Sequence, residues 1–223
     1  MIYGHFFVKV GMELRGILLI FVSAMIVLSV LSLFELSIAG ISILVGVIGF
    51  ILYRSKRQDL FGSHELSLPR FIIEFKMKPN WFWLVLPLIM NVLSLSIAAL
   101  FLPEFFTHLQ ERTEVALSFQ VIFLLIIQLT VMALGEEIAW RAFFQKQMSH
   151  FMPIAPAILV TSIFFTLGHF AIGPTLIVGY DLVFILINSV LYGVIFHKTN
   201  NAWMSALSHF VANVFAVLFV LMI

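Results

Sequence analysis

The chain has 223 residues, of which 62% are hydrophobic and only 10% are charged, and its mean hydropathy is +1.14. Soluble domains usually carry about 25% charged residues. A chain this short with so few charges therefore lacks the polar surface to cover itself in water. The net charge of +1 offers no basic surface for nucleic acid. The absence of cysteine excludes disulfides, thiolate metal sites and cysteine nucleophiles. The composition therefore predicts an integral membrane protein that lies in the lipid bilayer.

Seven apolar segments approach the length of about 20 residues that a helix needs to cross the hydrocarbon core. They are residues 16–34, 36–53, 81–102, 116–134, 154–170, 175–196 and 203–222. None shows the period-two alternation of a membrane β-strand. We therefore predict an all-α fold, a polytopic transmembrane bundle of about seven helices (six to eight). The first segment lacks a small-residue cleavage pattern and is expected to be retained.

One predicted membrane helix has an alternative interpretation. Residues 175–196 contain Gly179, Asp181 and Asn188, which are unusual in a lipid-embedded helix. The segment is therefore either one continuous helix or a broken or re-entrant one.

The basic residues predict the orientation of the chain. The longest polar loop, residues 54–80, carries six cations: Arg54, Lys56, Arg57, Arg70, Lys76 and Lys78. Because cytoplasmic loops are enriched in lysine and arginine, this loop is assigned to the inner side. The alternation of the other loops then leaves Arg112 as the only cation outside, with the N-terminus in the cytoplasm. Twenty-five phenylalanines and no cysteine resemble a bacterial protein, and the bacterial plasma membrane is the expected location.

Three polar clusters lie within or next to the apolar helices, at residues 135–141, 165–169 and 209–213. An ionisable side chain costs about 2.5–3.5 kcal/mol in the middle of a membrane helix, and such residues are functional candidates by default. The candidates are Glu136, Glu137, Arg141, His169, His209 and Asn213.

Helical spacing predicts how these side chains are oriented. Glu137 and Arg141 are four residues apart, share a helix face and can form an ion pair. Glu136 should point about 100° away, which leaves its carboxylate available for proton transfer. His209 and Asn213 are also four residues apart and should converge on one site.

A predicted hairpin near residue 152 brings two of the clusters to similar depth. Glu136 and His169 are nearly equal numbers of residues from this turn, so unbroken helices would place them level. His209 enters the last helix early from the inner side. All three clusters are therefore expected to meet in the inner half of the membrane.

Other intramembrane protease motifs are missing from the sequence. There is no HExxH zinc helix and no GxSxG nucleophile elbow. Asp181 has no partner for an aspartyl protease pair, because the only other aspartate, Asp59, lies in a loop.

The order of motifs EExxxR, FxxxH and HxxxN resembles the CPBP family, also called Abi, which groups CAAX prenyl proteases with bacteriocin-processing enzymes. Glu136, Glu137 and Arg141 match the first motif, Phe165 and His169 the second, and His209 and Asn213 the third. The resemblance covers about residues 116–216. It implies that residues 116–223 form the catalytic core of an intramembrane endopeptidase. Residues 1–115 carry none of these motifs and are expected to form the first three membrane helices with the basic cytoplasmic loop.

The resemblance also implies roles for the motif residues. Glu136 would be the general base that activates water, and His169 would orient that water. His209 and Asn213 would stabilise the oxyanion, while Glu137 and Arg141 would hold the site in place. Alternatively, His169 and His209 would bind a divalent metal such as zinc. A metallo- and a metal-free, glutamate-driven mechanism are both compatible with these residues.

The substrate and the activity have alternatives as well. The family processes prenylated CAAX proteins, bacteriocins and peptide signals, and it includes self-immunity proteins, so the expected substrate is a membrane-associated protein or peptide. The alternative is a non-catalytic membrane partner for immunity or regulation that keeps these residues for folding. Glu137 and Arg141 alone would fit a structural ion pair. A proton-coupled transporter is disfavoured because no internal repeat is evident.

Overall fold

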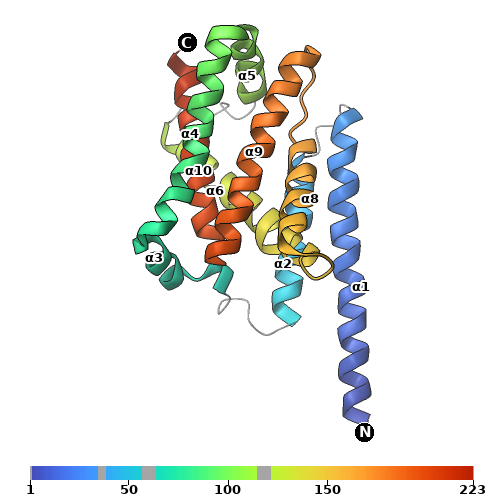
Figure 1. Ribbon diagram of the computed structural model, residues 1–223. Coiled ribbons are helices and arrows are strands. Elements are labelled where there is room, and N and C mark those ends of the chain that lie inside the picture. The colour runs from blue at the N-terminus through green and yellow to red at the C-terminus, as the bar shows by residue number, and fades with distance from the viewer. Residues whose placement is uncertain (1, 35–38, 57–63, 115–121, 223) are drawn as a thin grey trace.

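The computed structural model describes residues 2–34, 39–56, 64–114 and 122–222, and these residues contain helices and no β-strand. The long helices pack side by side as a bundle, and α1 extends well beyond the others at its N-terminal end (Figure 1). The helices are α1 (Ile2–Leu31), η1 (Ser32–Phe34), α2 (Ala39–Lys56), η2 (His64–Leu66), α3 (Leu68–Lys76), α4 (Lys78–Phe101), α5 (Glu104–Glu114), α6 (Ile122–Glu137), the π-helix η3 (Ile138–Gln145), α7 (Lys146–Met148), α8 (Ile154–Leu167), α9 (Thr175–Thr199) and α10 (Ala202–Met222).

The all-helical membrane fold is confirmed, and every predicted span coincides with a helix. By length and composition, five helical stretches qualify as membrane spans: Gly16–Phe34, Lys78–Phe101, Phe123–Met148, Thr175–Thr199 and Ala202–Val220. The other two predicted spans correspond to the shorter apolar helices Gly40–Ser55 and Ile154–Leu167. The number of seven membrane crossings therefore stays a prediction.

Two details of the predicted spans are decided by the structure. The stretch that contained Gly179 and Asp181 is one continuous helix, α9. The fourth span does not end at residue 134, because α6 continues through η3 and α7 to Met148. The beginning of that predicted span, residues 116–121, lies outside the described residues.

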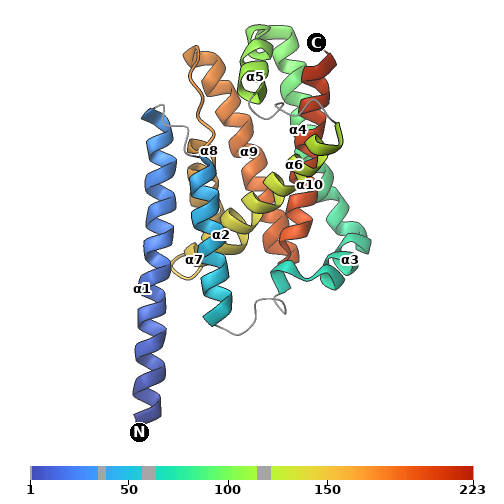
Figure 2. The same cartoon turned by 180° about the vertical axis from the view of Figure 1, so that it is seen from behind.

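The predicted hairpin is present, with a turn between Met148 and Ile154. The assumption of unbroken helices is wrong on both sides of it. The first arm contains a π-helix, and α8 ends at Leu167, so His169 lies in the turn that follows. Figures 1 and 2 show that the hairpin turn between Met148 and Ile154, α3 and the α9–α10 junction all lie toward the same end of the bundle. This is the end that the sequence assigns to the cytoplasm.

The polar loop predicted at residues 54–80 contains two ordered helical segments, η2 and α3. Pro69 occupies the first turn of α3, and Ser67 caps it by accepting a hydrogen bond from the backbone N–H of Arg70. Ile72 and Ile73 are exposed on this short helix. Because apolar and basic residues alternate around α3, its pattern is that of a helix lying at a membrane surface.

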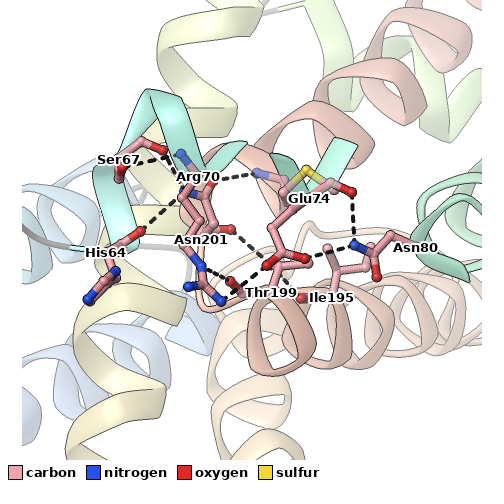
Figure 3. A network of polar contacts seen from close by, with 9 residues as sticks. His64, Ser67, Arg70, Glu74, Asn80, Ile195, Thr199 and Asn201 are labelled. Atoms are coloured by element: carbon pink, nitrogen blue, oxygen red, sulfur yellow. Dashed lines mark hydrogen bonds and ion pairs between the residues drawn. The ribbon is translucent and has the colours of Figure 1, made fainter. Parts of the chain in front are cut away.

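A polar network fastens α3 to the junction between α9 and α10 (Figure 3). Arg70 Nε donates to the carbonyl of Thr199 at 3.0 Å. The side chain of Asn201 donates to the carbonyls of His64 and Ser67 at 3.2 and 3.0 Å. Asn200 ends α9 in the left-handed conformation, with φ of 47°. This network sets the point at which α10 begins, seven residues before His209.

Helix α2 lies unusually close to the π-helix, and two glycines permit this approach. A Cβ at Gly46 would lie 2.6 Å from the Cβ of Ala139, and one at Gly49 would lie 2.6 Å from the ring of Phe143. Both distances are shorter than van der Waals contact allows. The small residues on α2 thus determine how tightly the helix that carries the glutamates is held.

Gly46→Ala is expected to destabilise the bundle by about 1–3 kcal/mol, because the added methyl group overpacks the contact with Ala139. Gly40→Ala is the matched control on the same helix, since nothing lies within 4 Å of its new Cβ. That substitution should be neutral or slightly stabilising. Thermal unfolding in detergent measures both; equal midpoints for the two variants would contradict the close packing.

Candidate active site

The two adjacent glutamates lie where the α-helix changes into a π-helix. Glu137 is the last residue of α6, and η3 follows at Ile138. Segments of π-helix occur frequently at functional sites. Glu137 and Arg141 are both fully buried, and Arg141 Nε lies 3.3 Å from Glu137 Oε2. Arg141 also donates to Ser189 Oγ on α9 at 3.0 Å. The predicted ion pair is therefore present, and it links the π-helix to α9.

His209 lies between the two carboxylates. Its Nδ1 is 3.2 Å from Glu137 Oε1, and its Nε2 is 3.5 Å from Glu136 Oε2. Both side chains therefore reach the same imidazole, at opposite nitrogens, although adjacent residues are expected to point about 100° apart. Nδ1 is within hydrogen-bonding distance of Glu137, whereas the contact of Nε2 with Glu136 is a longer charge contact.

Aromatic rings hold the two histidines. Tyr192 stacks on His209, with ring centroids 4.5 Å apart and an interplanar angle of 18°. Phe165 packs against both histidines, at 4.3 Å from the ring of His169 and 6.0 Å from that of His209. The two histidines of separate sequence motifs are thereby brought to opposite sides of one phenylalanine.

The tautomer of neutral His169 follows from its hydrogen bond. Its Nδ1 lies 2.8 Å from the carbonyl oxygen of Phe165. Because a carbonyl only accepts hydrogen bonds, Nδ1 carries the proton of the neutral ring. Nε2 is then the nitrogen with a lone pair, as orienting a water molecule requires.

A cavity of about 120 Å³ adjoins these residues. Since water occupies about 30 Å³ in the liquid, the cavity has room for several water molecules. Its lining includes His169, His209 and Asn213. Glu136, Glu137 and Arg141 do not line it; His209 separates them from the cavity. Of the predicted residues, the structure thus places three on the cavity wall and three directly behind it.

The conserved pattern of a known family covers this site. The family model described as type II CAAX prenyl endopeptidase Rce1-like matches residues 118–215. This segment, a little under half of the chain, is similar to the Rce1-like family. The match confirms the resemblance to CAAX proteases that the three motifs indicated, and it includes every predicted site residue. Comparison with curated proteins and with solved structures gives no match.

The Rce1-like segment contributes further cavity residues that the motifs did not reveal. Asp181, Phe184, Ile185, Asn188 and Tyr192 of α9 all line the cavity. The last four follow Asp181 by three, four, seven and eleven residues, which places all five on one helix face. The recurrence of polar residues at helical spacing within an apolar span could have indicated this polar helix face from the sequence.

A hydrogen-bonded chain of amides connects α9 to α4 and α10. Asn188 donates to Asn91 Oδ1 at 2.6 Å, and Asn91 donates to the carbonyl of Ala212 at 3.0 Å. Ala212 directly precedes Asn213. Hydrogen bonds between membrane helices each contribute about 0.6–2 kcal/mol. Asn91, which lies outside the Rce1-like segment, therefore helps to fix the position of the helix that carries His209 and Asn213.

The predicted metal ligands, His169 and His209, line the same cavity. Both ring nitrogens of His209 face carboxylates, so neither points toward a site shared with His169. Within the described part of the chain, no group of three or more histidine or carboxylate side chains is arranged as a metal site. Both the metal-dependent and the metal-free mechanism therefore stay predictions.

Glu137→Gln is expected to destabilise the protein by about 3–5 kcal/mol, because it leaves the buried guanidinium of Arg141 without its counter-charge. The matched control is Glu74→Gln, which removes the ion pair of Glu74 with Arg70, also four residues apart. Arg70, its partner, is 38% exposed, so the expected loss is below about 1 kcal/mol. Unfolding in detergent compares the two variants, and similar losses would show that the buried pair is not structurally important.

Proposed function

We propose that this protein is an intramembrane endopeptidase that hydrolyses a peptide bond of a membrane-associated protein or peptide, with CAAX-type prenylated substrates as the first class to test. The observation that carries the proposal is the meeting of three separate motifs around His209, beside one cavity. Glu136 and Glu137 contact His209, while His169 and His209 share a wall of the cavity. The match of residues 118–215 to the Rce1-like family supports it independently.

Glu136 is the general base in this proposal. Glu137 is held by Arg141 and by His209, whereas Glu136 has the more weakly placed contact, 3.5 Å from His209. A carboxylate without a buried counter-ion of its own is the better candidate to take a proton from water. Catalytic groups are often loosely placed before substrate binds and tighten afterwards, which allows Glu136 to move past the edge of His209 to the cavity.

The other residues divide the remaining tasks. His169 orients the attacking water through Nε2. Asn213 stabilises the negative charge on the carbonyl oxygen in the tetrahedral transition state. His209, four residues before it on α10, contributes through Nε2 once Glu136 has moved to the cavity. Glu136 then returns its proton to the leaving amine, so that one water molecule is added across the peptide bond. Glu137, Arg141 and Tyr192 are positioning residues that hold the imidazole of His209.

Localisation to a bacterial plasma membrane, with the N-terminus in the cytoplasm, is part of this proposal. It rests on the concentration of basic residues in the connections at one end of the bundle. The substrate would enter this bundle from the lipid, since the cavity lies among helices that are long and apolar enough to cross a membrane.

Glu136→Gln should lower kcat for hydrolysis of a farnesylated CAAX peptide by about 10²- to 10⁴-fold, the usual contribution of a general base. KM and the unfolding midpoint should change little. The matched control is Glu104→Gln on the exposed surface of α5, which should keep full activity. The measurement is release of the peptide product by purified protein in liposomes. Full activity of Glu136→Gln would refute the assignment of the general base, and the absence of hydrolysis by the wild-type protein would favour the non-catalytic alternative.

Removal of divalent metals should leave the hydrolytic activity unchanged, because both nitrogens of His209 face carboxylates. The test is the hydrolysis rate before and after incubation with chelators, together with the zinc content of the purified protein. Loss of activity that returns with zinc, and a zinc content of one ion per chain that falls in His209→Ala, would contradict the metal-free mechanism.

A further inference from the structure

A second polar pair borders the cavity, away from the glutamates. The carboxylate of Asp181 lines the cavity and is 4% exposed. His108 Nε2 lies 3.4 Å from Asp181 Oδ2 and comes from α5, which packs across this end of the bundle. Among the described residues that line the cavity, Asp181 is the only carboxylate. A buried acidic group of this kind is costly in a membrane protein and marks a functional position by default.

The separation between Asp181 and the proposed catalytic groups follows from α9. Tyr192, which stacks on His209, comes eleven residues after Asp181 on the same helix face. At a rise of about 1.5 Å per residue, the two positions are roughly 16 Å apart along the helix axis. Asn188 lies between them on that face. The cavity is therefore bordered by polar groups along this length rather than at His209 alone.

This length corresponds to a short extended peptide. An extended chain advances about 3.3 Å per residue, so roughly 16 Å spans about five residues. A substrate whose peptide bond lies beside His209 would place a side chain about five residues away near Asp181. The chemistry that a carboxylate recognises in such an apolar setting is a cation, because their attraction is weakly screened there.

We propose that Asp181 is a specificity-determining residue that binds a lysine or arginine side chain of the substrate about five residues from the hydrolysed bond. His108 is its partner in the substrate-free protein, and the substrate cation pairs with the carboxylate when the cavity is filled. This inference rests on the proposed peptidase function and narrows its substrates to peptides with a cation at this distance.

A structural role for Asp181 would be the attachment of α5 to α9, and other contacts already provide this. Phe105 of α5 packs edge-on against Tyr180, with ring centroids 5.1 Å apart, and Phe106 packs against Phe219 of α10 at 5.5 Å. Asparagine at position 181 retains a polar contact with His108 and removes only the charge. This substitution therefore separates recognition of a cation from attachment of the helix.

The experiment uses a series of farnesylated CAAX peptides. Each peptide carries one lysine, and its position varies through the series from two to eight residues from the hydrolysed bond. Matched peptides carry norleucine, which keeps the aliphatic stem and lacks the charge. The wild-type protein should hydrolyse the lysine peptide with a kcat/KM about 10- to 100-fold higher at a position near five residues, as expected for one charged hydrogen bond. Asp181→Asn should abolish this preference, while Asp181→Glu should retain most of it.

Glu104→Gln is the control, since it removes a carboxylate from the exposed surface of α5 without affecting the cavity. It should keep the lysine preference, and the unfolding midpoints verify that each variant is folded. Hydrolysis by the wild type without any lysine preference, or an unchanged preference in Asp181→Asn, would overturn the role of Asp181 alone. Failure of the wild type to hydrolyse any of these peptides would overturn the proposed function on these substrates and the inference with it.

Discussion

The burial of two carboxylates beside one another is the constraint on which the site depends. Neither Glu136 nor Glu137 can reach bulk water from its place in the bundle, being 6% and 0% exposed. Burying an ion costs several kcal/mol unless it is paired and hydrogen-bonded. Arg141 and His209 supply the compensating partners, one from the same helix and one from α10. The helices are thus held in position by the charges that the proposed chemistry requires.

This requirement explains the close packing around the site. Arg141 must be fully enclosed to pair with Glu137, and the glycines of α2 allow that helix to approach within contact distance of the π-helix on its other side. The network of Arg70 and Asn201 fixes the start of α10 at the surface. The positions of the two partners, Arg141 and His209, are therefore determined from opposite ends of the bundle.

The sequence predicted the local pairings and missed those that depend on the helix type or on distant helices. Glu137 with Arg141 follows from a spacing of four residues within one helix, which tertiary structure did not alter. The meeting of the clusters was expected, but the contact of Glu136 with His209 was not predicted, because it joins distant helices. The change to π-helix after Glu137 has no sequence signature either. Asn91 was missed for a similar reason. Its partner Asn188 is 97 residues away, and no local spacing relates them.

The unequal environments of the two glutamates provide the last step. If both were equally paired, neither would be suited to exchange a proton with water. Glu137 contacts Arg141 and His209, and its role is to keep the imidazole in a fixed orientation. Glu136 contacts only the opposite nitrogen of that imidazole, Nε2. A substrate or water molecule that binds His209 therefore also alters the surroundings of Glu136. Adjacent residues of the same type thereby acquire different surroundings, since both contact one histidine while Arg141 forms its ion pair with Glu137.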